Sequence, residues 1–144
     1  MQYYDFWGYQ AELDKTATRA WYEKEGEWGC ECGHCRNFLE LARRKQLPAA
    51  VLDLLGQLEI PPEKATYVCE LYPTEQGDLY QFNYRMAGCI LNEDSQQEPS
   101  PFEGGTVCCG HDPYPYGAPD FPEPHFDLMF FAELPWVLDE SQRG

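Results

Sequence analysis

The hydrophobic pattern along the chain changes its period near its middle. Apolar side chains first recur three and four positions apart in two segments, Cys35 to Ala42 and Val51 to Leu58, which predicts two amphipathic helices. Pro48 separates these helices, and the Pro-Pro pair at 61–62 ends the second. After this pair, apolar and polar positions alternate, which is typical of strands with one buried face.

Alternation is clearest from Tyr80 to Met86, and we expect this strand to form a hairpin with 65–72. Gly88 interrupts the alternation and predicts a bulge or the close approach of another segment. The other expected strands are Thr16–Tyr22, Thr106–Cys109 and Phe126–Leu138. The order of elements therefore predicts an α+β fold: a single domain with a mainly antiparallel sheet of about five strands and two helices packed on one face.

The expected domain covers residues 16–140, between an N-terminal arm at 1–15 and a tail at 141–144. The arm is rich in aromatic residues, which we expect to pack on the domain or on a partner. Two segments, 92–105 and 112–124, have the composition of loops. The second is rich in proline and is either a stiff connection or, through its tyrosines, an aromatic recognition surface.

Charge narrows the range of partners. The 144 residues include 25 acidic and 10 basic side chains, a formal charge of −15, so nucleic acid and membrane surfaces are not expected partners. Residues 1–45 hold seven basic and eight acidic residues, whereas 46–144 hold three and seventeen. An acidic sheet and its loops would favour a basic protein partner. With 43% apolar residues, the chain can still form a core.

The N-terminus has no secretory signal pattern and no apolar run reaches the length of a membrane span, so we expect a cytoplasmic protein. Disulfides are rare in that reducing compartment. The seven cysteines are therefore expected to be thiols, metal ligands or redox groups. Cys69 and Cys89, inside expected strands, are expected to be core residues.

Cys30, Cys32 and Cys35 form a C-x-C-x-x-C cluster directly before the first expected helix. Such spacing lets one turn direct several sulfurs to a common point, as a structural zinc site requires. A tetrahedral site needs a fourth ligand. Cys109 and His111 are the candidates, because residues two apart on an extended segment face the same side.

Three interpretations of the cluster stay open: metal ligation, a redox pair made of Cys32 and Cys35, and thiols without a chemical role. We see no other convincing catalytic arrangement, no acid/base couple of carboxylates and no phosphate-binding glycine loop. The favoured hypothesis is a non-enzymatic small domain that acts in protein interaction, with a structural zinc site at the cluster. The alternative is a thiol redox or metal-dependent enzyme that uses Cys32 and Cys35.

Several segments together resemble a family of small acidic bacterial proteins with no assigned activity. The most specific are the C-x-C-x-x-C-x-N-F motif at 30–38 and the terminal PWVLDE sequence at 135–140. The Leu-x-Ile-x-Pro turn at 58–62 and the Tyr84-x-x-x-Gly88-x-Ile90 pattern also carry the likeness. The resemblance implies that the three cysteines of the motif are the distinctive polar positions, and it implies no substrate.

Overall fold

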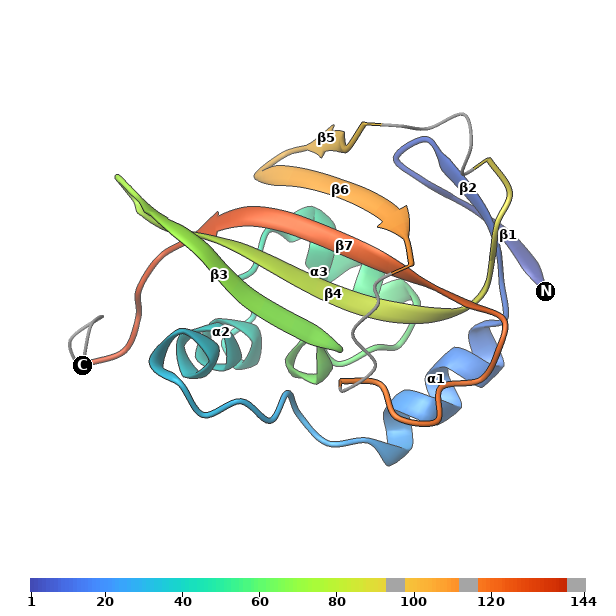
Figure 1. Ribbon diagram of the computed structural model, residues 1–144, viewed down its shortest axis with the longest axis horizontal. Coiled ribbons are helices and arrows are strands. Elements are labelled where there is room, and N and C mark those ends of the chain that lie inside the picture. Colours follow the sequence, from blue (N-terminus) through green and yellow to red (C-terminus); the bar gives the residue numbers. More distant parts are fainter. Residues whose placement is uncertain (93–97, 112–116, 140–144) are drawn as a thin grey trace.

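The computed structural model describes residues 1–92, 98–111 and 117–139, and in these ranges three helices accompany seven strands (Figure 1). The helices are α1 (Lys15–Lys24), α2 (Gly33–Arg43) and α3 (Ala49–Gln57), with a short 3₁₀ turn, η1 (Pro62–Lys64). The strands are β1 (Gln2–Phe6), β2 (Tyr9–Leu13), β3 (Tyr67–Thr74), β4 (Gly77–Ile90), β5 (Ser100–Phe102), β6 (Gly105–Gly110) and β7 (His125–Leu134). Every strand pair is antiparallel, so the expected α+β class is confirmed, with more strands and helices than the sequence indicated.

The long strand β4 organises the sheet. The strand order is β1-β2-β4-β7-β6-β5, and β3 also pairs with β4. Along one edge, β4 pairs with β7 from Asp78 to Ala87. Along its other edge, β3 pairs with the first half of β4 and β2 with its end. The predicted hairpin of β3 and β4 is therefore confirmed. On this second edge, β4 has a stretch between β3 and β2 where none of the described strands pairs with it.

The aromatic N-terminus forms the hairpin of β1 and β2, which joins the sheet through β4. Gly88 is one of the three residues of β4 that pair with β2, and it lies opposite Leu13. Its φ is +144°, and a Cβ at this position would lie 2.0 Å from the carbonyl oxygen of Glu12. The predicted close approach of another segment at Gly88 is confirmed, and that segment is β2.

Helix α1 replaces the strand expected at Thr16–Tyr22, so that prediction was wrong. Its tryptophan, tyrosine and threonines favour strands in isolation, but tertiary packing overrides this preference. Asp14 caps the helix by accepting a hydrogen bond from the backbone N–H of Ala17 at 3.0 Å. The buried side chains Thr18, Trp21 and Tyr22 lie at i, i+3 and i+4, which is one helical face.

This helix occupies the gap beside β4 and satisfies its backbone. The Tyr22 hydroxyl donates to the Arg85 carbonyl at 2.8 Å, and the Ala87 N–H donates to the Thr18 hydroxyl at 3.0 Å. The Asp14 N–H donates to the Ala87 carbonyl at 2.8 Å. Because unpaired buried backbone groups are costly, these bonds explain how β4 continues here with a strand on one edge only.

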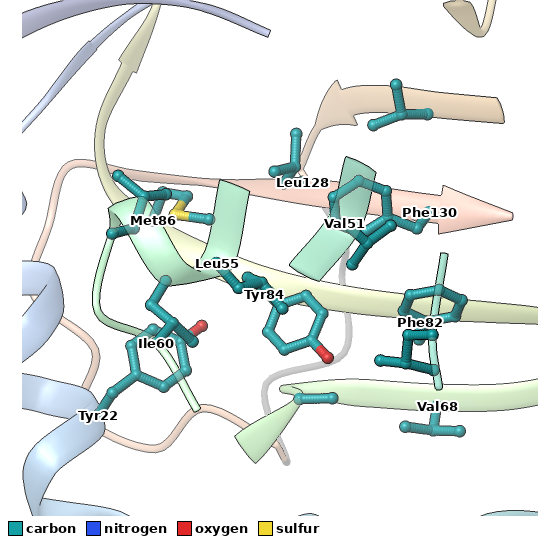
Figure 2. Close-up of a cluster of buried hydrophobic side chains, with 14 of the residues drawn as sticks. Tyr22, Val51, Leu55, Ile60, Val68, Phe82, Tyr84, Met86, Leu128 and Phe130 are labelled. Carbon is teal, nitrogen blue, oxygen red and sulfur yellow. The ribbon is translucent and has the colours of Figure 1, made fainter. Parts of the chain in front are cut away.

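The apolar core lies between one face of β4 and β7 and the helices (Figure 2). Phe82 and Phe130 stack across the two strands with ring centroids 5.6 Å apart, and Val51 and Leu55 of α3 belong to the same cluster. The predicted apolar face of the last strand is buried throughout: Phe126, Leu128, Phe130, Ala132 and Leu134. That strand ends at Leu134 rather than Leu138, since Pro135 follows.

The prediction that Cys69 and Cys89 are core residues was wrong, because neither side chain lies on the buried face of its strand. Cys69 pairs with Gln81 on the polar face of the sheet and is only partly buried, while its neighbour Val68 faces the core. Cys89 pairs with Glu12, and both are exposed. Neither cysteine is a core residue.

Of the two expected loops, 92–105 contains β5, and the described part of the second, 117–124, has neither helix nor strand. Residues 93–97 and 112–116 lie outside the described residues, and with them Tyr114 and Tyr116 of the expected recognition surface. The tail at 141–144 also lies outside them.

Candidate metal centre

The cysteine cluster lies where the connection from α1 enters α2. Cys32 is the N-cap residue of α2, with extended backbone, and its Sγ accepts the backbone N–H of Cys35 at 3.4 Å. This position commonly holds a short polar side chain, because the first N–H groups of a helix lack intrahelical partners. The Cys32 sulfur therefore lies at the N-terminal end of α2, where the backbone N–H groups point.

The three sulfurs gather as the spacing predicts. The Sγ atoms of Cys30, Cys32 and Cys35 all lie within 4.8 Å of one another, and those of Cys30 and Cys32 are 3.4 Å apart. Two thiolates on one tetrahedral zinc lie about 3.8 Å apart, since the Zn–S bond is about 2.3 Å long. The observed separations, from 3.4 Å to no more than 4.8 Å, are close to that value, so a metal could be held with small side-chain adjustments.

Burial differs sharply within the triad. Cys30 and Cys32 are exposed, whereas Cys35 is 5% exposed and packs with the core. The indole N–H of Trp28 donates to the Cys35 sulfur at 3.1 Å. Trp28 is itself fixed, because its backbone N–H donates to the Glu63 carbonyl and its ring contacts Tyr67 edge-on. The innermost sulfur of the triad is therefore held in place by a fixed neighbour.

The surroundings of Cys30 and Cys35 shift the pKa values of their thiols in opposite directions. Loss of hydration raises the pKa of Cys35 far above its ordinary value, despite the hydrogen bond from Trp28. At Cys30 the pKa is lowered, first by a hydrogen bond from the backbone of Cys32 and then by the neighbouring Cys35 thiol. Without metal, Cys30 therefore forms a thiolate more readily than Cys35 does, and Cys35 keeps its proton.

A cleft of about 360 Å³ opens beside the triad, and Cys30 forms part of its wall. The cleft lies between the α1–α2 connection, the residues around η1 and the segment at 117–119. Trp21 and Trp28 line it together with Lys64, whose ammonium donates to the Tyr22 carbonyl at 2.7 Å. The sequence could not indicate this cleft, because its walls come from three separate segments.

Cys109 and His111 are not part of the cysteine group among the described residues. Cys109 lies on β6 and is buried opposite Leu128 of β7. The triad begins α2, which contacts β3, and β3 is separated from β6 by β4 and β7. Three strand spacings amount to about 14 Å. The structure thus brings together Cys30, Cys32 and Cys35 and leaves the two proposed fourth ligands elsewhere.

His34, inside the motif, is not a member of the group either. Its ring packs edge-on against Trp136 and Tyr80, with centroids 5.7 and 6.2 Å away. The motif residue Asn37 is buried as well, and its amide donates to the Pro135 carbonyl at 2.9 Å and accepts the Val137 N–H at 2.8 Å. Asn37 of the motif therefore anchors the C-terminal segment to α2, while Phe38 packs against Tyr80 and Phe82 of β4.

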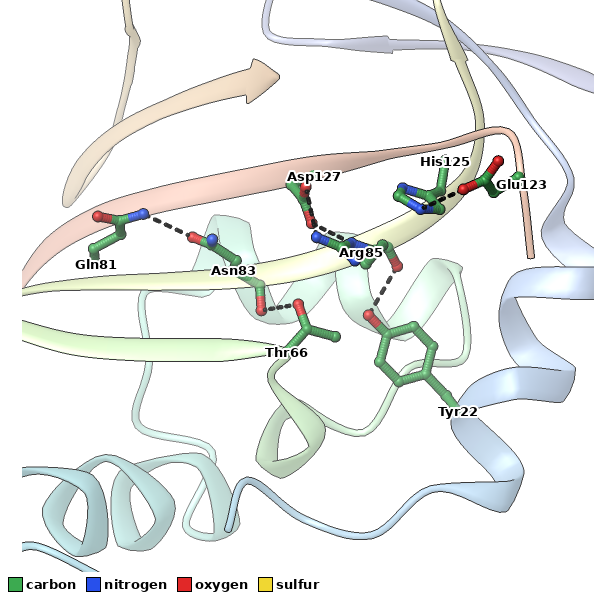
Figure 3. Close-up of polar contacts among 8 residues, drawn as sticks. All are labelled: Tyr22, Thr66, Gln81, Asn83, Arg85, Glu123, His125 and Asp127. Carbon is green, nitrogen blue, oxygen red and sulfur yellow. Dashed lines mark hydrogen bonds and ion pairs between the residues drawn. The ribbon is translucent and has the colours of Figure 1, made fainter. Parts of the chain in front are cut away.

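Three polar residues on the face of β4 and β7 opposite the core are also buried: Asn83, Arg85 and Asp127. Arg85 pairs with Asp127, its direct neighbour on β7, with Nε and Oδ1 2.8 Å apart (Figure 3). Farther along the same face, the Gln81 amide donates to the Asn83 side-chain oxygen at 3.2 Å. A signal was present in the sequence: Asp127 is the single charge in an otherwise apolar run from Phe126 to Ala132.

Comparison with protein-family models, with curated protein sequences and with solved structures yields no match. The resemblance to the small acidic bacterial family therefore stays a prediction. Among the described residues, no helix is both long and apolar enough to span a membrane.

Proposed function

We propose that this protein is a non-enzymatic metal-binding domain that holds zinc through Cys30, Cys32 and Cys35 and acts in protein interaction. The observation that carries the proposal is the convergence of three sulfurs within 4.8 Å of one another, at the start of a helix. Thiolate ligands suit zinc, and an iron–sulfur cluster would commonly need four cysteines. A cytoplasmic location, as the sequence indicates, would keep these thiols reduced and available for the metal.

The zinc would connect the α1–α2 connection to the first turn of α2 and to the core behind Cys35. Because the folded chain holds the three sulfurs in place for a metal, zinc that binds the folded chain more tightly than the unfolded chain would add to the stability of the fold. The acidic surface formed by residues after 45 supports a basic protein as the partner. No described feature supports nucleic acid or membrane binding.

The test is metal stoichiometry and affinity in three proteins: the parent chain, Cys32→Ser and Cys89→Ser. Serine retains an oxygen that can cap α2, so Cys32→Ser removes the ligand while keeping the capping hydrogen bond. Cys89→Ser is the matched control, since Cys89 is an exposed thiol outside the triad. We expect one zinc per chain in the parent and the control, and at least a tenfold weaker affinity in Cys32→Ser. No bound metal, or equal affinity in all three, would overturn the proposal.

A second candidate function has one specific observation in its favour. The sulfurs of Cys30 and Cys32 are 3.4 Å apart, and the pKa of Cys30 is lowered, so these two could exchange with an external disulfide. The Cys30 thiolate would attack that disulfide and release one thiol, and Cys32 would then displace the second. The sequence had indicated Cys32 and Cys35 as the redox pair, but burial keeps Cys35 protonated, which makes Cys30 the better partner of Cys32. After reaction with oxidised glutathione, peptide mapping identifies which two cysteines have formed a disulfide. If bound zinc completely protects the thiols from this reaction, the result favours the metal function.

A further inference from the structure

The triad supplies three donors, and a tetrahedral zinc takes four. Among the described residues, no fourth cysteine, histidine or carboxylate joins the group. Cys30 belongs both to the triad and to the wall of the adjacent cleft, so a metal on the triad would border that cleft. An open coordination position beside a preformed cleft is the arrangement in which a metal binds a ligand from outside the chain.

We propose, resting on the zinc function above, that the cleft beside Cys30 receives a histidine side chain of a partner polypeptide, whose imidazole completes the coordination of the metal. The binding step exchanges ligands only: the neutral imidazole nitrogen forms a bond to zinc and a bound water leaves. Neither oxidation nor proton transfer is needed.

Charge selects imidazole over an anionic donor. Zinc with three thiolates already carries a net charge of −1. Of the charged residues in the cleft wall, Glu27 is paired with Arg43, and Glu25 and Lys64 carry opposite charges, so the wall itself does not offset the charge of the metal centre. A thiolate or carboxylate from outside would raise the negative charge in a partly enclosed site, where like charges repel more strongly than in water. A neutral nitrogen donor avoids this cost.

The shape and lining of the cleft support an amino-acid side chain in a polypeptide. Its volume of about 360 Å³ is larger than one imidazole ring, so neighbouring atoms of a chain can also enter. Trp21 and Trp28 offer flat apolar walls for the ring. Glu25 in the wall would favour a basic residue beside the histidine, in agreement with the basic partner that the overall charge indicates.

Gly29 is a position at which a larger side chain can block the cleft, and Gly56 provides a matched control outside it. Gly29 lines the cleft, its backbone is outside the left-handed region, and a Cβ there meets no atom within 4 Å. Gly29→Leu therefore fills open space rather than displacing protein atoms. Gly56, in α3, is equally open and lies away from the cleft, so Gly56→Leu is the matched control.

The experiment uses the full chain loaded with cobalt(II), whose visible absorption reports the metal's ligands. Free imidazole is titrated into the parent, Gly29→Leu and Gly56→Leu. We expect a saturable spectral change with one imidazole per metal in the parent and in Gly56→Leu, and at least a tenfold weaker affinity in Gly29→Leu. Mercaptoethanol should bind the parent more weakly than imidazole does. An unchanged spectrum, an unaffected Gly29→Leu variant or a preference for the thiol overturns the inference.

A second arm separates a polypeptide ligand from a small imidazole. Peptides containing Lys-His-Lys and Glu-His-Glu are compared with free imidazole at low and high salt. We expect the basic peptide to bind at least fivefold more tightly than the other two probes, with an advantage that shrinks as salt screens the charges. Equal affinities would overturn the partner assignment. If the chain binds no metal at all, the proposed zinc function fails as well, whereas metal binding without imidazole binding overturns only this inference.

Discussion

Arg85 and Asp127 are direct cross-strand neighbours whose ion pair is almost completely buried, with side chains 6% and 2% exposed. Removing one member of such a pair leaves the other charge without water or counter-ion. We therefore expect Asp127→Leu to lower the free energy of unfolding by about 3–5 kcal/mol. Urea denaturation followed by tryptophan fluorescence measures this loss.

The same pair predicts a non-additive double variant. Arg85→Met combined with Asp127→Leu replaces both charges by apolar groups, so no buried charge is left unpaired. The double variant should be more stable than Asp127→Leu alone. A double variant that loses the sum of the two single effects would show that the two side chains act independently.

Tyr22 couples the stability of the fold to alkaline pH. Burial raises the pKa of the Tyr22 hydroxyl well above its ordinary value of 10.0, because the phenolate would lose its hydration. Above pH 10 the unfolded chain releases this proton while the folded chain keeps it. Stability from this group is therefore fully present below pH 10 and is lost as pH rises further, by about 1.4 kcal/mol per pH unit.

Tyr22→Phe tests that linkage with two opposite effects. At pH 7 the variant should be less stable by about 1–3 kcal/mol, because the Arg85 carbonyl loses its donor. Above pH 10 its stability should fall less steeply than that of the parent. Equilibrium denaturation at several pH values gives both slopes, and parallel curves would contradict the assigned role of burial. Tyr84→Phe offers a second case, since burial also raises the pKa of Tyr84 well above the ordinary value.

Gly88 on β4 leaves no room for a side chain. Its φ of +144° and the 2.0 Å approach to the Glu12 carbonyl oxygen would force β2 away from the sheet. We expect Gly88→Ala to cost at least about 2 kcal/mol, which corresponds to a decrease in Tm of about 4–8 °C. Gly26→Ala is the control, because a Cβ there meets nothing within 4 Å, and its stability should change by less than about 0.5 kcal/mol.

The sequence predicted the elements whose patterns are set by local geometry. The helix after Cys35, the helix from Val51 and the alternation from Tyr80 to Met86 each have one buried face, so their period alone revealed them. Helix α1 was missed because Trp21 and Tyr22 favour strands intrinsically, and the cap at Asp14 carries the opposite signal.

The candidate site was predictable to a similar extent. Three cysteines within six residues had to lie near one another, and the helix they precede fixed the geometry. Cys109 could not be placed, because its position depends on how many strands separate β6 from α2. The burial of Arg85 against Asp127 depends on strand register, which a single sequence does not specify.

Zinc should raise the thermal stability of the chain through the triad. A ligand that binds only the folded state at a hundred times its Kd adds about 2.7 kcal/mol, which corresponds to an increase in Tm of about 5–11 °C for a chain of this size. Differential scanning fluorimetry with zinc and then with a chelator measures the increase and its reversal. With an affinity at least tenfold weaker, Cys32→Ser should show at most about half of this increase, while Cys89→Ser should behave as the parent does. Equal shifts in all three proteins would place the stabilising zinc at another site.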